Sequence, residues 1–265
     1  MKAIAVRPKK ANSVSLIEIE KPRINDGEIL IKTISVGIDG TDIEINQGLY
    51  GEAPTEEELL VIGHEAVGKV VAVGKGVGNI QVDDFVVPTV RRECGVCINC
   101  KNAEPDMCES DDYKERGIVG AHGYLSQYFK ENVDNLVKIS PDLVPYGSLI
   151  EPLSIAQKAV EHIFKIQERF RWRPKTAFVM GAGPLGLLAA LILKKKGLDT
   201  FSYDIVAEDS PKAKVAKNIG ATYINGNKVS LGDLPHVHKE RPDLIIEATG
   251  NSYVAFWAID VMIKN

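Results

Sequence analysis

The stretch Thr176–Gly186, TAFVMGAGPLG, decides the fold of the second half of the chain. Its first five residues are short and apolar enough for a buried strand, and the turn after them has the spacing G-x-G-x-x-G. The first glycine permits a tight turn, the second lets the backbone approach a pyrophosphate, and the third allows the next helix to pack closely on the strand. The residues expected to contact a dinucleotide in this turn are Gly181, Ala182, Gly183, Pro184, Leu185 and Gly186.

A carboxylate follows the next predicted strand, where a dinucleotide's ribose would lie. The strand is expected over Thr200–Tyr203, and Asp204 at its end is expected to hydrogen-bond the adenosine ribose. As an alternative, Asp204 is a solvated loop carboxylate or a helix cap. Asp209 and Ser210 are better caps, however, for the helix expected over Pro211–Ile219.

Two further strands and a final helix complete the predicted sheet. The strands are expected at Ala221–Ile224 and Asp243–Glu247, and the helix at Ser252–Lys264. The loop after the second of these strands adds Thr249 to the predicted cofactor-binding residues. The second half is therefore predicted to be α/β, a doubly wound parallel sheet of the Rossmann type.

The run Thr176–Leu193 also has to be tested as a membrane span, because it carries no charged residue and its length approaches that of a spanning helix. Three glycines and a proline interrupt it, and a strand, a turn and a buried helix explain it better. We therefore expect no membrane partner. The first residues, MKAIAVRPKK, lack the apolar region and cleavage site of a secretory signal, so a cytoplasmic location is expected.

The composition is that of a soluble globular protein, with 45% hydrophobic and 26% charged residues in a chain of 265. The 32 basic and 36 acidic residues give a net charge of -4. The sequence has no basic stripe that would neutralise phosphates, so nucleic acid is not expected as a partner.

All four cysteines lie close together in one short segment, with the spacing C-x2-C-x2-C-x7-C. Disulfides are disfavoured in a cytoplasmic chain, whereas four thiolates can surround one zinc ion tetrahedrally. An iron–sulfur cluster and unliganded thiols are the alternatives, but the bacterial ferredoxin run has a different spacing before its last cysteine. The predicted structural zinc ligands are Cys94, Cys97, Cys100 and Cys108.

The first half of the chain is rich in strand-forming residues. Strands are predicted at Lys2–Val6, Ser15–Glu20, Glu28–Val36 and Gly68–Val73. The pattern then changes, with a helix predicted over Ala156–Phe170. We therefore predict a β-rich catalytic domain over residues 1–155, with the cysteine lobe at about 92–110, and a dinucleotide-binding domain over residues 156–265.

Three short motifs carry a family resemblance. They are GIDGTD at 37–42, GHEAVG at 63–68 and the dipeptide Glu151-Pro152. Each alone resembles an ordinary turn or surface segment, but their order with the cysteine lobe and the Rossmann half resembles the zinc-dependent medium-chain dehydrogenase/reductase superfamily over the whole chain. VPTVRR at 87–92, ERGIVGAHG at 115–123 and LIEPL at 149–153 are similar to the archaeal glucose 1-dehydrogenase family.

The resemblance implies a GroES-like catalytic domain in front of the Rossmann domain. It also implies oxidation of D-glucose, and of other aldoses such as galactose, to the aldonolactone, the first step of non-phosphorylative Entner–Doudoroff-type glucose degradation. The implied cofactors are two zinc ions per chain and NAD or NADP. The implied partners are a small sugar substrate and further copies of the chain, in a dimer or a tetramer.

By the same resemblance, Asp39, His64 and Glu151 hold the catalytic zinc, and Glu65 is the neighbouring carboxylate that can reach the metal or its water. Three protein ligands leave an open position at which zinc can polarise a substrate oxygen. Thr41 matches the hydroxyl that relays the proton, although it can also cap a helix. The residues implied in sugar binding are Thr41, Glu115 and Glu151, and those implied in catalysis are Thr41 and Glu65.

The sequence departs from the family's pattern at the metal site and at the sugar site. Asp39 stands where most superfamily members have cysteine, which leaves the charge of the ligand set unchanged. Val90 and Ile155 stand where some glucose dehydrogenases have polar sugar contacts.

The residues after the second Rossmann strand predict that NAD is preferred over NADP. Asp204 would repel a 2′-phosphate, and Ile205 and Val206 supply no guanidinium to bind one. Lys212 and Lys214 are the cations that could support some use of NADP.

Two alternatives to a glucose dehydrogenase stay open at this point. One is another zinc-dependent polyol, alcohol or threonine dehydrogenase, and the other is a non-catalytic protein that binds zinc and a nucleotide. Because four strands and one final helix account for the second half, the Rossmann domain is expected to be incomplete, with roughly a quarter of a full enzyme's length missing. We therefore expect either a longer natural reading frame or low activity of the 265-residue chain.

Overall fold

The computed structural model describes residues 1–234 and 242–262. It consists of two compact units, Met1–Glu151 and Pro152–Asn265, each treated by itself below. The division falls slightly before the boundary expected at 155.

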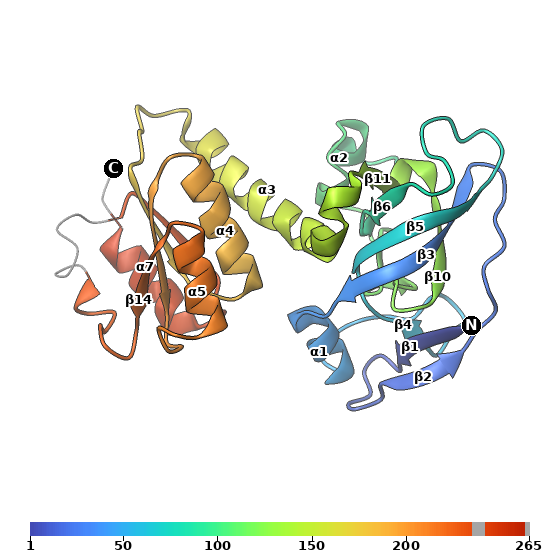
Figure 1. The fold of residues 1–265 in the computed structure, drawn as a ribbon, viewed down its shortest axis with the longest axis horizontal. Helices are drawn as coiled ribbons and strands as arrows, with labels where there is room; N and C mark the ends of the chain where they lie inside the picture. Colours follow the sequence, from blue (N-terminus) through green and yellow to red (C-terminus); the bar gives the residue numbers. More distant parts are fainter. Residues whose placement is uncertain (235–241, 263–265) are drawn as a thin grey trace. The chain divides into compact units, whose positions relative to one another are not determined.

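A five-stranded antiparallel sheet forms the body of the first unit (Figure 1). Residues of its two central strands, Ile29, Ile31 and Val70, pack with Tyr124 and Phe129 into a buried cluster. Residues 29–31 are all buried, and Val67 packs in a separate cluster with Val87 and Ile139, so this part of the sheet is covered on both faces. In sheet order the strands are β10 (Tyr128–Asn132), β3 (Glu28–Gly37), β5 (Glu65–Val73), β6 (Phe85–Pro88) and β11 (Leu136–Ile139).

Two small sheets and short helices complete the first unit. One sheet has the order β2 (Ser15–Glu18), β1 (Lys2–Val6), β4 (Leu60–Val61), and the other β7 (Arg91–Arg92), β8 (Lys114–Arg116), β9 (Gly120–Ala121). The helices are α1 (Gly40–Asn46), α2 (Ile98–Lys101) and the 3-10 turns η1 (Pro105–Met107), η2 (Val133–Asn135) and η3 (Pro141–Leu149).

Helix α3 (Ile150–Gln167) begins earlier than the helix predicted at Ala156. Pro152 is compatible with this early start, because a proline in the first turn of a helix has no amide hydrogen that the helix needs. The helix follows η3 directly, so Glu151 lies at its first turn.

The second unit is built on a parallel four-stranded sheet with the order β14-β13-β12-β15. Numbered along the chain, this is the order 3-2-1-4 of a Rossmann sheet, which confirms the predicted parallel fold. The strands are β12 (Thr176–Met180), β13 (Asp199–Asp204), β14 (Thr222–Asn225) and β15 (Leu244–Glu247), and the helices are α4 (Pro184–Lys195), α5 (Pro211–Asn218) and α7 (Ser252–Val261). The predicted end of the last helix at Lys264 lies outside the described residues.

Strand β12 is buried on both faces, which explains its unbroken apolar sequence. Ala177 and Val179 pack against α3 and α4, whereas Phe178 and Met180 pack with Val254 of α7 on the opposite face. The uncharged run that could have suggested a membrane span is therefore a strand, a turn and a helix. No helix in the described part of the chain is long and apolar enough to cross a membrane.

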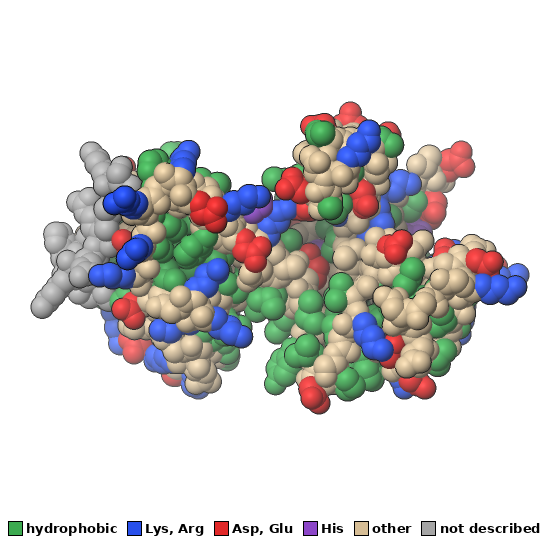
Figure 2. Space-filling view, turned by 90° about the horizontal axis from the view of Figure 1, so that it is seen from above, with side chains coloured by type: hydrophobic (Ala, Val, Ile, Leu, Met, Phe, Trp, Pro, Cys, Tyr) green, Lys and Arg blue, Asp and Glu red, His purple; other side chains and the backbone are tan. Residues whose placement is uncertain are grey.

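Charged side chains of both signs are interspersed on the face that Figure 2 shows.

Candidate active site

Three of the predicted site residues converge at one edge of the first unit. The pairing of β3 with β5 places Gly37 opposite Glu65, so the residues that follow Gly37 lie next to those at the start of β5. One ligand atom each from Asp39, His64 and Glu65 lies within 4.8 Å of the others. The antiparallel ladder thus brings together residues that are far apart in sequence.

Asp39 also begins helix α1. One of its carboxylate oxygens, Oδ1, accepts a hydrogen bond from the backbone N–H of Asp42 at 3.1 Å, as an N-cap does. The other oxygen, Oδ2, accepts a hydrogen bond from the Thr41 hydroxyl at 3.0 Å. The alternative role of Thr41 as the helix cap is therefore wrong, because Asp39 occupies that position.

Asp42 ties the two ligand-bearing segments together, a role that was not expected from the sequence. Its side chain is buried and accepts hydrogen bonds from the N–H of Asp39 at 3.3 Å and of Gly63 at 3.0 Å. Burial raises the pKa of Asp42. The signal that could have found it is a capping box, an acidic residue three positions after the cap.

Burial and mutual repulsion raise the pKa values of two site carboxyl groups to about 7. For Glu65 the main cause is burial, followed by the negative charges of Asp39 and Asp42. For Glu151 burial is again first, and the carboxylates of Glu65, Asp39 and Glu115 add to it. Glu151 is not one of the three converging residues, but the negative charges of Glu65 and Asp39 contribute to raising its pKa.

The donor set at this site fits a zinc ion. His64 is buried, and its Nδ1 atom has no hydrogen-bond partner among the described residues. Its Nε2 atom lies 3.7 Å from Oδ2 of Asp39, too far for a hydrogen bond. An imidazole nitrogen with several carboxylate oxygens is a set that zinc accepts, and a bound cation would relieve the repulsion that raises the carboxyl pKa values.

Glu115 lies in a salt bridge that was not anticipated from the sequence. Arg91 stands directly opposite it in the β7–β8 ladder, and the Arg91 Nη2 and Glu115 Oε1 atoms are 2.9 Å apart. The Arg91 guanidinium also lies 3.9 Å from the ring centre of Tyr113. Arg91 therefore fixes the carboxylate that the resemblance assigns to sugar binding. Because the two partners are far apart in sequence, only the pairing of the strands reveals this contact.

A second ion cluster holds the same strand pair. Glu131 is buried, and its Oε1 atom lies 2.8 Å from both Arg92 Nη2 and Arg116 Nε. The Tyr124 hydroxyl donates to the same carboxylate oxygen at 3.0 Å. Arg92 and Arg116 are the immediate neighbours of Arg91 and Glu115, so this cluster anchors both strands.

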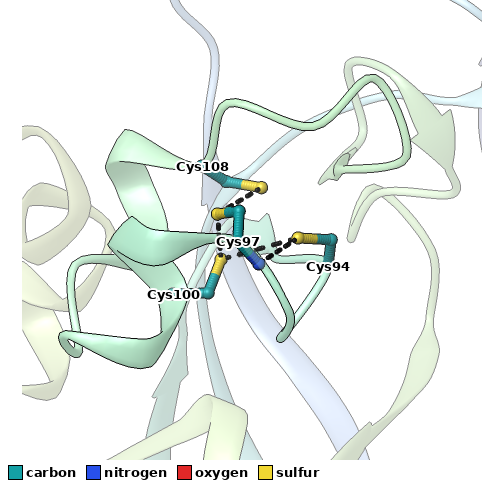
Figure 3. A group of neighbouring side chains, drawn as sticks. All are labelled: Cys94, Cys97, Cys100 and Cys108. Atoms are coloured by element: carbon teal, nitrogen blue, oxygen red, sulfur yellow. Dashed lines mark hydrogen bonds between the residues drawn. The ribbon is translucent and has the colours of Figure 1, made fainter.

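The four cysteine sulfur atoms face one another in the cysteine lobe (Figure 3). Cys97 and Cys100 are 3.3 Å apart, Cys94 and Cys100 3.9 Å, and Cys97 and Cys108 4.0 Å. None of these separations is a disulfide. Four sulfurs at tetrahedral zinc would be about 3.8 Å apart, so the lobe fits a structural zinc ion.

In the glycine turn of the second unit, the first and third glycines have the structural roles expected of them. A Cβ at Gly181 would lie 2.8 Å from the carbonyl oxygen of Ala248, and its φ of 106° is in the left-handed region. A Cβ at Gly186 would lie 2.0 Å from the carbonyl oxygen of Gly181. Gly183, at the start of α4, has nothing within 4 Å of such a Cβ. The protein itself therefore does not require glycine there, as expected where a pyrophosphate approaches the backbone.

Two carboxylates border this turn. Asp204 ends β13, and its carboxylate accepts hydrogen bonds from the N–H of Ala182 at 2.7 Å and of Val206 at 3.2 Å. Glu247, which was not expected from the sequence, accepts hydrogen bonds from both the N–H and the hydroxyl of Thr249. Asp204 caps no helix, because Ser210 caps α5.

Two family models together match almost the whole chain. Residues 25–141 match the alcohol dehydrogenase GroES-like domain, and residues 144–265 match the glucose dehydrogenase C-terminus. The first of these confirms the GroES-like fold predicted for the N-terminal unit.

Relatives and solved structures agree with these matches. A glucose 1-dehydrogenase of Methanocella arvoryzae is 44% identical over 100% of this chain and 74% of its own length. Glucose 1-dehydrogenase 2 of Vulcanisaeta moutnovskia is 42% identical over 96% of this chain and 70% of its own. A structure of Haloferax mediterranei glucose dehydrogenase in complex with NADP, Zn and gluconolactone has a TM-score of 0.88 at 39% identity, covering 99% of this chain and 74% of that one.

The chain belongs to the zinc-dependent glucose 1-dehydrogenase family. The resemblance stated from the sequence is thus confirmed, together with the α/β fold class of a GroES-like unit followed by a Rossmann unit. This member of the glucose 1-dehydrogenase family spans about three quarters of the length of the relatives that it matches.

Proposed function

We propose that this chain oxidises D-glucose at its anomeric carbon to gluconolactone, with NAD as the preferred hydride acceptor. The observation that carries the proposal is the convergence of Asp39, His64 and Glu65 within 4.8 Å in a chain 44% identical to a glucose 1-dehydrogenase. Asp39, His64 and Glu151 would hold a catalytic zinc with Glu65 beside them, and the four cysteines would hold a second, structural zinc.

When bound, zinc would polarise the substrate hydroxyl and the nicotinamide would accept the hydride. Thr41 is the residue of this chain that can move the hydroxyl proton, because its Oγ1 atom is already hydrogen-bonded to Oδ2 of Asp39. Proton transfer through Thr41 would pass its own hydrogen to its acceptor, Oδ2 of Asp39, as the substrate's hydrogen reaches Oγ1. Glu115, held by Arg91, would accept hydrogen bonds from sugar hydroxyls.

For the cofactor, the glycine turn would bind the pyrophosphate and Asp204 would bind the adenosine ribose. The absence of an arginine at positions 205–208 supports NAD as the preferred cofactor. In the proposal the reaction opens non-phosphorylative glucose degradation in the cytoplasm, galactose is a second aldose substrate, and the working enzyme is a dimer or a tetramer.

A substrate panel tests the proposal. D-glucose, D-galactose, sorbitol, ethanol and L-threonine are assayed with NAD and with NADP by reduced-nicotinamide absorbance, and metal content is measured on the same sample. We expect the aldoses to be oxidised fastest and two zinc ions per chain. Faster turnover of sorbitol, ethanol or threonine would replace the proposal by a polyol, alcohol or threonine dehydrogenase. Inert kinetics with bound nucleotide would indicate a non-catalytic protein.

Single variants test the proposed roles. Thr41→Val should lower kcat about 100-fold or more, whereas Thr41→Ser, which keeps the hydroxyl, should retain most of the activity. Glu115→Gln should raise KM for glucose, while Glu44→Gln, an exposed position on α1, serves as the matched control. Equal kcat values for Thr41→Val and Thr41→Ser would remove Thr41 from the proton path.

A further inference from the structure

The loop after β13, residues 204–208, is held by side chains from the next strand and turn. The Tyr223 hydroxyl lies 2.7 Å from the carbonyl oxygen of Val206 and 3.2 Å from that of Asp204. Asn227 donates from Nδ2 to the carbonyl oxygen of Ile205 at 2.6 Å. The carbonyl oxygens of three consecutive residues, 204 to 206, therefore lie within hydrogen-bond distance of side chains outside the loop.

The same loop carries the carboxylate proposed to bind the ribose. Asp204 is hydrogen-bonded through one oxygen to Ala182 in the glycine turn and through the other to Val206 in its own loop. Its backbone carbonyl is bonded to Tyr223. The side-chain carboxylate and the backbone carbonyl of Asp204 are thus both fixed relative to the turn where the pyrophosphate would bind.

Two lysines contact this loop at Glu208. Lys228 forms a salt bridge with Glu208 at 2.8 Å, and Lys217 donates to the carbonyl oxygen of Glu208 at 3.1 Å. Lys212 and Lys214, which the sequence suggests as cations for NADP, are exposed on α5. A 2′-phosphate would therefore meet a fixed carboxylate, with Lys217 and Lys228 engaged by Glu208.

We propose that Tyr223 is a positioning residue that enforces the preference for NAD over NADP, by preventing the Asp204 loop from moving away from a 2′-phosphate. This inference rests on the proposed cofactor preference. A repulsive group discriminates only if it cannot relax, since a carboxylate on a mobile loop can rotate into solvent when the larger ligand arrives. Burial, with the nearby Asp204 and Glu208 charges, raises the pKa of Tyr223 to about 12, so its hydroxyl stays protonated and can donate.

Direct binding tests the proposal without catalysis. NAD and NADP are each titrated into the protein of residues 1–265 by calorimetry, and the ratio of the two Kd values is compared among variants. Tyr223→Phe keeps the ring and removes the hydroxyl that both carbonyl oxygens share, so it should lower the ratio Kd(NADP)/Kd(NAD) about threefold to tenfold. Asn227→Ala should shift the ratio in the same direction. Tyr253→Phe, at an exposed tyrosine on α7 of the same unit, should leave it unchanged.

The outcomes separate this inference from the proposed function. A wild-type ratio at or below 1 would remove the NAD preference itself, and the inference with it. A wild-type ratio well above 1 that is the same in Tyr223→Phe and Asn227→Ala would overturn the inference alone. A purely structural role for Tyr223 would weaken both cofactors equally and leave the ratio fixed, which also overturns it. If Tyr223→Phe does not fold, Asn227→Ala decides the question.

Discussion

The most demanding prediction concerns Glu131, the buried carboxylate that anchors the strands carrying Arg91 and Glu115. Glu131→Gln keeps the shape of the side chain but removes the charge that two guanidinium groups and the Tyr124 hydroxyl share. Arg92 and Arg116 would then be left as uncompensated charges with side chains only 19% exposed.

The size of the effect follows from that burial. Breaking a buried ion pair by removing one partner costs about 3–5 kcal/mol. Because both arginines keep some solvent contact and the glutamine oxygen can still accept one hydrogen bond, we expect a loss of about 2–4 kcal/mol. For a unit of this size, that corresponds to a fall in Tm of roughly 4–16 °C.

Two optical probes show which of the two units has lost stability. Both tryptophans of the chain, Trp172 and Trp257, belong to the second unit, so their fluorescence follows that unit alone. Circular dichroism follows both units. Glu131→Gln should lower the midpoint temperature of the transition seen by circular dichroism and leave that of the tryptophan fluorescence transition nearly unchanged.

Glu58→Gln is the matched control, because Glu58 also pairs with an arginine, Arg7, but its side chain is 77% exposed. An exposed pair contributes less than about 1 kcal/mol. If Glu131→Gln melts within about 2 °C of Glu58→Gln, the reasoning from burial is refuted.

Three further predictions use the glycine turn, the carboxyl groups and the cysteines. Gly186→Ala should destabilise the second unit by about 1–3 kcal/mol, because its Cβ would meet the Gly181 carbonyl oxygen. Gly183→Ala should keep the Tm but lose cofactor affinity. Equal losses of stability in the two variants, measured by calorimetry, would contradict this prediction. In chelator-stripped protein, the pKa values of Glu65 and Glu151 are raised from 4.5 to about 7, so between these pH values the folded state binds more protons than the unfolded state. Tm should therefore fall as pH rises from about 4.5 to about 7, and a rising Tm would count against the site. Graded chelation should remove the zinc proposed at Asp39, His64 and Glu151 before the zinc at the four cysteines, as metal analysis would show, and simultaneous release of both ions would be the contrary result.

Local sequence determined the parts of this protein whose partners are near in the chain. The strand, glycine turn and helix of residues 176–195 could be predicted from their own sequence. A short apolar segment forms the buried strand, the glycines form the turn after it, and the apolar residues that follow form the helix. The cysteine lobe could be predicted for the same reason, since four ligands so close in sequence can meet without help from the rest of the fold.

Tertiary structure alone decided the contacts between distant segments. Asp42 bonds to Gly63, Arg91 pairs with Glu115, and Tyr223 bonds to the loop at Asp204 only because neighbouring strands set the register between them. The capping box marks Asp42 as a residue of a helix start but not as the partner of Gly63, and a tyrosine in a strand does not indicate which loop it will contact. The physical reason is that hydrogen bonds and ion pairs depend on separations of about 3 Å, which strand pairing fixes and sequence spacing does not.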